Sequence, residues 1–216
     1  LLIFSSLTWV KQTLDITQIL IPEVLTATIA RIAPVLRTLR HGDGTLVRFH
    51  GGGQGSEHVL DQALAISEVR PSAPLDEAMG FARLNAGSTS LVVDAVAPPT
   101  SLGRFSAHAS TGAFEMSVGR NRLILNCGSG ASFGEDWHLA GRGTASHTTL
   151  SINGLSSASF APTKTGEQSP LVDGPQRVIM KKTRAVDGVR LQTNHNGYQI
   201  SHGLIHARTF DLPLDG

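Results

Sequence analysis

Residues 106–118 read SAHASTGAFEMSV, residues 123–127 read LILNC, and residues 143–154 read GTASHTTLSING. Short runs of apolar and β-branched residues, separated by turn residues, predict antiparallel strands. If these segments pair, His108, Asn126 and His147 converge on one place in the fold. Two imidazoles and an amide brought together in this way are the main candidate site of the sequence.

The composition predicts a turn-rich protein with extended β structure. The chain has 216 residues, of which 23 are glycine, and only 5% are aromatic, and this balance favours β structure over a helical bundle. Lysine and arginine number 18 against 17 aspartates and glutamates, without a polybasic run, so we expect no nucleic-acid partner. The single cysteine, Cys127, excludes an internal disulfide framework and a cysteine-rich zinc module.

The N-terminal region of the chain is predicted to be helical. Apolar residues recur near the helical period at Leu25, Ile29 and Ile32, and Pro34 is expected to kink this helix or end it early. The apolar run over residues 1–10 is too short to cross a bilayer. We therefore predict a buried helix there and no membrane span.

The remainder of the chain is predicted to consist of strands. From Met79 onward, strand-like runs such as residues 90–94 and 145–152 alternate with turn residues. We therefore predict an α+β chain, with a helical segment over residues 1–70 and an antiparallel β-sandwich domain over residues 71–216.

The order and spacing of four passages resemble the heparinase II/III-like family of polysaccharide lyases. These passages are residues 36–49, 80–94, 108–154 and 197–208. The resemblance implies the C-terminal end of an α/α toroid, followed by the beginning of a large antiparallel β-sandwich. Because family members are far longer, it also implies that the chain is a fragment, and that the family's catalytic tyrosine and one histidine precede Leu1.

For the central passage, the resemblance implies proton-transfer chemistry beside a structural zinc. Such lyases cleave uronate-containing glycans by β-elimination, which needs a neutralised carboxylate, a base and an acid. The family's two zinc histidines fall on His108 and His147, and its zinc aspartate falls on Asn126. Ser106 occupies the position of the catalytic histidine. Two imidazoles and a neutral amide are a poor donor set for zinc.

Three interpretations of the histidine pair stay open: hydrogen-bonded core histidines, a residual metal site, or a direct catalytic role. Arginine can clamp a carboxylate through paired N–H groups, and aromatic rings can stack on a sugar. The candidates for substrate binding are therefore Arg104, Arg142 and Trp137, and the candidates for catalysis are Tyr198 and Arg142.

Two main hypotheses for function follow. The first is a polysaccharide lyase, a carbon–oxygen lyase that acts on an acidic polysaccharide or oligosaccharide. For it the resemblance implies a periplasmic or cell-envelope location, although no targeting signal is visible. The second is a non-catalytic relative that binds a glycan or a protein, and the residues at Ser106 and Asn126 favour it. A purely structural β-sandwich is a third hypothesis.

Overall fold

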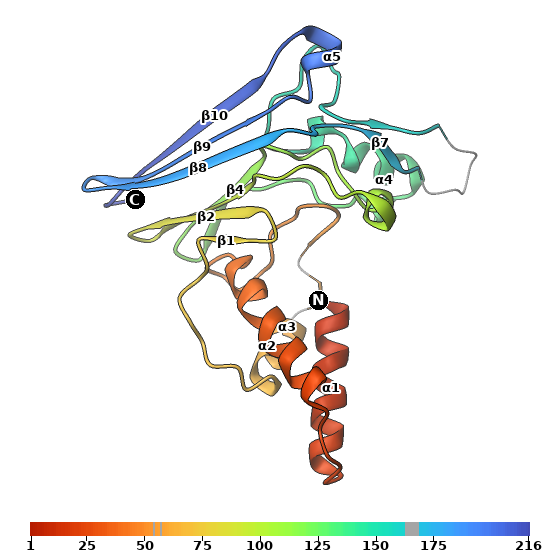
Figure 1. Cartoon of the computed structure of the whole chain (residues 1–216), viewed down its shortest axis with the longest axis vertical. Helices are drawn as coiled ribbons and strands as arrows, with labels where there is room; N and C mark the ends of the chain where they lie inside the picture. Colours follow the sequence, from red (N-terminus) through yellow and green to blue (C-terminus); the bar gives the residue numbers. More distant parts are fainter. Residues whose placement is uncertain (54, 57, 163–168) are drawn as a thin grey trace.

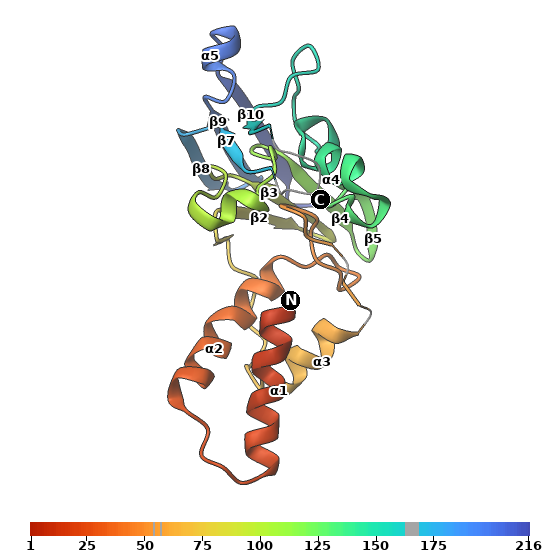
Figure 2. The same cartoon turned by 90° about the vertical axis from the view of Figure 1, so that its right-hand side faces the viewer.

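The computed structural model describes residues 1–53, 55–56, 58–162 and 169–216. The N-terminal region consists of the helices α1 (Leu2–Ile16), α2 (Glu23–Thr38) and α3 (Val59–Ile66). Each helix contributes a buried apolar side chain to a common core, namely Phe4, Ile29 and Leu60. The helices lie at one end of the molecule and the sheets at the other (Figure 1, Figure 2).

Two expectations for the helical region can be compared with the structure directly. Pro34 lies inside α2, which continues to Thr38, so the proline does not end the helix early. Within the described ranges, no helix is both long and apolar enough to cross a membrane. The toroid, of which these helices would be the last portion, stays a prediction.

The largest sheet has five antiparallel strands, which neighbour each other in chain order. They are β1 (Glu77–Ala78), β2 (Phe81–Ala86), β3 (Thr89–Asp94), β4 (Phe114–Val118) and β5 (Asn121–Ile124). In β3 and β4, inward positions carry carboxylates as well as apolar side chains, because Asp94 and Glu115 are fully buried. These two acidic residues become important for the candidate site.

A second antiparallel sheet packs against the first. Its strands are β8 (Val178–Ala185), β9 (Gly188–His195) and β10 (His206–Pro213), with β9 in the centre. Leu191 and Leu212 from this sheet share one apolar core with Leu84 and Val93 from the five-stranded sheet. The two layers are visible one above the other in Figure 1. The predicted α+β class with antiparallel sheets is therefore confirmed.

The remaining elements are short. They are the 3₁₀ helices η1 (Ser101–Phe105), η2 (Ala131–Phe133) and η3 (Thr144–Ser146), the helices α4 (Glu135–Arg142) and α5 (Gln199–His202), and the paired strands β6 (Ser159–Phe160) and β7 (Leu171–Asp173). The strand expected over residues 145–152 is wrong: that segment contains the end of η3 and an isolated bridge between Ile152 and Leu155. Side-chain hydrogen bonds from Thr144 and Thr148 hold it in place of a ladder.

The connection between the helices and the sheets approaches the turn between β4 and β5 closely. A Cβ added at Gly42 would lie 1.8 Å from the carbonyl oxygen of Gly119. Only glycine allows the two backbones to come this close. The contact fixes where the connection, which carries His41 and His50, crosses the sheet.

We therefore expect Gly42→Ala to destabilise the fold by about 1–3 kcal/mol, as overpacking typically does. Urea denaturation of both proteins measures the change in the free energy of unfolding. Gly53→Ala is the matched control, because no heavy atom of the described residues, chain neighbours aside, lies within 4 Å of the added Cβ. Equal stability of the two variants would contradict the close contact at Gly42.

Candidate functional site

The histidine pair comes together as the sequence predicts, although not through paired strands. His108 follows η1 and His147 follows η3, and both are buried, with exposed fractions of 1% and 7%. Nδ1 of His108 lies 3.1 Å from Nε2 of His147. The rings are nearly perpendicular, at 78°. The two imidazoles are thus in direct hydrogen-bond contact.

The surrounding backbone fixes the tautomers of this pair. Nδ1 of His147 lies 2.8 Å from the carbonyl oxygen of Gly143, which only accepts, so this nitrogen carries a proton. In the neutral ring, Nε2 then accepts from Nδ1–H of His108. Nε2 of His108 therefore keeps its lone pair. This nitrogen faces Gly51, since a Cβ added at Gly51 would lie 3.5 Å from it.

Burial keeps both rings neutral. It lowers the pKa of His108 to about 2, with a further decrease from the neighbouring His147 and His50. Burial also lowers the pKa of His147, against an opposing effect of the hydrogen bond to Gly143. Neither ring therefore holds a proton at neutral pH that it could donate as an imidazolium.

A third imidazole, His50, links the pair to a buried carboxylate. Its Nδ1 accepts the backbone N–H of His108 at 3.0 Å, and its Nε2 lies 3.4 Å from Oδ2 of Asp94. The same oxygen accepts the hydroxyl of Ser110 at 2.6 Å. His50 has a positive φ of 46°, a strained conformation for a residue with a side chain.

Asn126 is occupied by structural hydrogen bonds on both sides of its amide. Its Nδ2 donates to Oε1 of Glu115 at 3.0 Å, and its Oδ1 accepts the backbone N–H of Thr148 at 2.9 Å. Oε1 of Glu115 also accepts the backbone N–H groups of Asn126 and Arg48, while Oε2 lies 2.7 Å from Nε2 of His41. Asn126 therefore spans the gap between Glu115 and the segment after His147.

These contacts argue against zinc at His108, Asn126 and His147. Zinc takes lone pairs from three or four ligands, commonly with an anion among them. Here the two imidazoles are neutral ligands, the third proposed ligand is an amide rather than an anion, and the oxygen of that amide already accepts the backbone N–H of Thr148. Over the described ranges, no three histidine, cysteine, aspartate or glutamate side chains are grouped as a metal site. The donor set does not fit the implied zinc.

Arg142 lies inside the scaffold. Its exposed fraction is 1%, and its N–H groups donate to the backbone carbonyls of Ala107, Ser169 and Arg104 at 2.9, 2.5 and 3.1 Å. Its guanidinium also lies over the ring of Phe160, 4.5 Å from the centroid. Each of its three nitrogens thus donates to backbone, which supports a positioning role.

Tyr198 is also fully buried. Its hydroxyl donates to the carbonyl oxygen of Leu150 at 2.5 Å, and burial raises its pKa. By contrast, Arg104 and Trp137 are exposed, and Trp137 contacts the ring of Phe133 at 6.4 Å between centroids. Arg142 and Tyr198 are therefore buried in the scaffold, whereas Arg104 and Trp137 lie at the surface.

Sequence reasoning missed the buried carboxylates and a second histidine pair. Asp94 and Glu115 occupy inward positions of strands, and a charged residue at an inward position is the signal that could have revealed them.

The second histidine pair consists of His195 and His206. Nδ1 of His195 accepts the N–H of Gly197, so its Nε2–H donates to Nδ1 of His206 at 3.0 Å. Burial lowers the pKa of His195 to about 4.

The neutral imidazoles predict that the protein loses stability in mild acid. In the unfolded chain these histidines take up protons below the ordinary pKa of 6.5. In the folded protein, His108 has a pKa of about 2 and His195 a pKa of about 4, so both stay neutral there. Stability therefore falls as pH falls below 6.5, by up to about 1.4 kcal/mol per pH unit for each imidazole. Urea denaturation between pH 7 and 4.5 measures the slope.

We expect His108→Gln to reduce this slope and the control His202→Gln, at a partly exposed residue, to leave it unchanged. A flat wild-type profile would contradict the buried neutral pairs.

Comparison with known proteins agrees with this fold. The family described as Heparinase II/III-like, C-terminal, matches residues 69–216. The chain can also be superposed on a crystal structure of heparinase III with a TM-score of 0.63 and 14% identity, covering 97% of this chain and 36% of that one. The heparan sulfate lyase HepC mutant from Pedobacter heparinus gives a TM-score of 0.61 and 14% identity, covering 90% and 32%. At these identities the likeness shows the fold alone.

A sequence relative has a different description. FtsZ-localized protein C of Caulobacter vibrioides (strain NA1000 / CB15N) is 31% identical over 195 residues, which cover 88% of this chain and 33% of that protein. The chain thus spans about a third of the length of this curated relative. Since the family match includes most of the chain and both sheets, the chain belongs to the heparinase II/III-like family, through the C-terminal domain of its members.

Proposed function

We propose that this chain is a segment of a non-catalytic member of the heparinase II/III-like family, which binds a protein partner. The observation that carries the proposal is the buried hydrogen-bond network at the candidate site. Asn126 uses both ends of its amide within the fold, and His108 donates to His147. A lyase site needs groups that are free to reach substrate and exchange protons. Here both ends of the Asn126 amide and both nitrogens of His147 are hydrogen-bonded, and Nε2 of His108, which keeps its lone pair, belongs to a side chain that is only 1% exposed.

The nature of the relative supports a protein partner. A protein described as FtsZ-localized matches this chain over 195 residues at 31% identity. Localisation with another protein requires a contact with that protein or with something bound to it. The sandwich would then serve as a rigid support for binding surfaces, while the buried network stabilises it.

Metal content and lyase activity test the absence of catalysis. We expect the purified protein to contain substoichiometric zinc and to release no unsaturated uronate, measured by ultraviolet absorbance, from heparan sulfate or polyglucuronate. One zinc per chain that is lost in His108→Ala and His147→Ala, but retained in the control His202→Ala, would overturn the proposal. Unsaturated product from the wild-type protein would overturn it as well.

Localisation tests the partner. A fluorescent fusion of the protein is expected to coincide with FtsZ in dividing bacterial cells, as the description of the relative implies for that protein. A fusion distributed uniformly while FtsZ is localised would contradict the proposal.

The second candidate is an active lyase on an acidic glycan, in the periplasm or cell envelope. Membership of the heparinase II/III-like family favours it, together with the exposed Arg104 and Trp137 as glycan contacts. In that case the catalytic groups would come from residues outside this chain, and the absorbance assay above would detect the product.

A further inference from the structure

The chain contains two asparagine–glycine sequences, Asn153–Gly154 and Asn196–Gly197, and the structure places them in opposite environments. In such a sequence the backbone nitrogen of the glycine can attack the side-chain amide of the asparagine, because glycine has no Cβ to obstruct the approach. The attack needs a free glycine N–H, a free asparagine amide and room for the backbone to rotate. The two sites differ in all three respects.

The first sequence forms the tip of a two-residue turn. Asn153 and Gly154 are both exposed, and their φ angles of 51° and 76° are positive, as in the type I′ turns that favour asparagine followed by glycine. One isolated bridge, between Ile152 and Leu155, closes the turn. Because this bridge is isolated, little structure opposes the backbone rotation that brings the nitrogen of Gly154 toward the amide of Asn153.

The reacting groups of the first sequence are free. Over the described residues, neither the side-chain amide of Asn153 nor the N–H of Gly154 forms a hydrogen bond. A Cβ added at Gly154 would have no described heavy atom within 4 Å, chain neighbours aside. The attacking nitrogen and the amide carbon can therefore meet without first giving up a hydrogen bond of their own.

The reacting groups of the second sequence are held. Oδ1 of Asn196 accepts the backbone N–H groups of Gln176 and Arg177 at 3.0 and 2.9 Å. The N–H of Gly197 donates to Nδ1 of His195 at 3.2 Å. These three hydrogen bonds would have to break before the nitrogen of Gly197 could reach the amide of Asn196.

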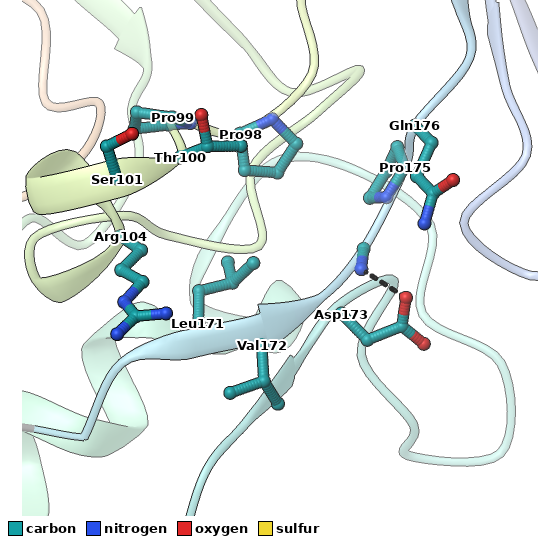
Figure 3. Close-up of a pocket in the computed structure, with 11 residues that line it drawn as sticks. Pro98, Pro99, Thr100, Ser101, Arg104, Leu171, Val172, Asp173, Pro175 and Gln176 are labelled. Carbon is teal, nitrogen blue, oxygen red and sulfur yellow. Dashed lines mark hydrogen bonds between the residues drawn. The ribbon is translucent and has the colours of Figure 1, made fainter.

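The backbone of the second sequence is also crowded. A Cβ added at Gly197 would lie 2.7 Å from the carbonyl oxygen of Ser157 and 2.9 Å from Cγ of Pro175. Figure 3 shows Pro175 and Gln176 on the segment that follows Asp173 at the end of β7. Segments that are distant in the chain thus close around Gly197, and they oppose the rotation that the attack needs.

From this contrast we propose that Asn153 is a site of spontaneous deamidation in the folded protein, and that Asn196 is protected by the fold. The nitrogen of Gly154 forms a bond to Cγ of Asn153. The side-chain nitrogen takes up the proton of that N–H group and leaves as ammonia, and the product is a cyclic succinimide. Water then opens the ring at one of its two carbonyl groups, which gives aspartate or isoaspartate. Water is the only co-reactant.

Both products change the turn. Each adds a carboxylate, which lowers the formal net charge of +1 by one unit. Isoaspartate also leads the main chain through the former side chain, and so lengthens the turn by one carbon atom. On the two sides of the turn, the carbonyl oxygens of Leu150 and Leu155 lie 2.5 and 3.5 Å from the hydroxyl of the buried Tyr198. The modification thus lies where this segment is joined to the core, and the inference does not depend on the proposed function.

Ageing the purified protein at mildly alkaline pH tests the inference, with peptide mapping by mass spectrometry as the measurement. We expect the mass gain of amide-to-acid conversion, together with isoaspartate, at Asn153. The rate there should exceed the rate at Asn196 by about tenfold or more, because three hydrogen bonds must break first at the second site. In the urea-unfolded chain the two rates should be similar, because only the shared asparagine–glycine chemistry then remains.

Two glycine variants identify the cause. Gly154→Ala should slow the reaction at Asn153, because the added Cβ obstructs the attacking nitrogen. Gly203→Ala is the matched control and should leave the rate unchanged. Gly203 also has a positive φ and no described heavy atom within 4 Å of an added Cβ, but it follows His202 instead of an asparagine.

Hydroxylamine detects the intermediate, because it attacks a succinimide carbonyl and cleaves the chain after the former asparagine. The folded protein should therefore yield the fragments 1–153 and 154–216. An Asn153 that keeps its amide in the folded protein but reacts in urea would overturn the inference, as would equal rates at the two sites before unfolding. Conversion to aspartate alone, at the same rate in Gly154→Ala, would indicate direct hydrolysis and would overturn it as well.

Discussion

The rest of the site depends on the hydrogen bonds that the buried carboxylate of Glu115 accepts. Glu115 lies on β4 with no exposed surface. Its carboxylate accepts the backbone N–H groups of Arg48 and Asn126 and the side-chain amide of Asn126, and it also contacts the imidazole of His41. A buried carboxylate is costly unless donors satisfy it. The connection after α2 and the end of β5 must therefore meet at Glu115, and their meeting places Asn126 beside the segment that follows His147.

Asp94 has a similar role on the neighbouring strand β3. His50 and Ser110 contact its Oδ2, and the backbone of His108 donates to His50. Two carboxylates thus hold the connection through two histidines, His41 and His50. The cost is visible in the positive φ of His50. His41 and His50 therefore contact buried carboxylates and help to hold the fold together, and the proposed function does not assign them to proton transfer.

Arg142 shows how a residue type suited to one task can serve another. A guanidinium fits a substrate carboxylate well, and the same fork of N–H groups also fits three backbone carbonyls. In this fold it joins η1 to the segment before β7 and keeps Arg104 at the surface. In the described part of the chain Arg104 is exposed while Arg142 is buried, so these two neighbouring arginines have separate roles at the surface and in the interior.

By itself, the sequence determined the α+β class and the antiparallel strands, because alternation, turn residues and helical period are local signals. His108 and His147 do meet, but across 39 residues and without the expected strand pairing, so the tertiary structure decided how they approach each other. The expected strand over residues 145–152 failed because Thr144 and Thr148 replace ladder bonds by side-chain bonds to distant backbone. Only the tertiary structure decided what Arg142, Tyr198 and Asn126 do. Their partners lie 35, 48 and 11 residues away for the bonds to Ala107, Leu150 and Glu115, and a sequence pattern does not record which distant carbonyl or carboxylate a buried side chain will meet.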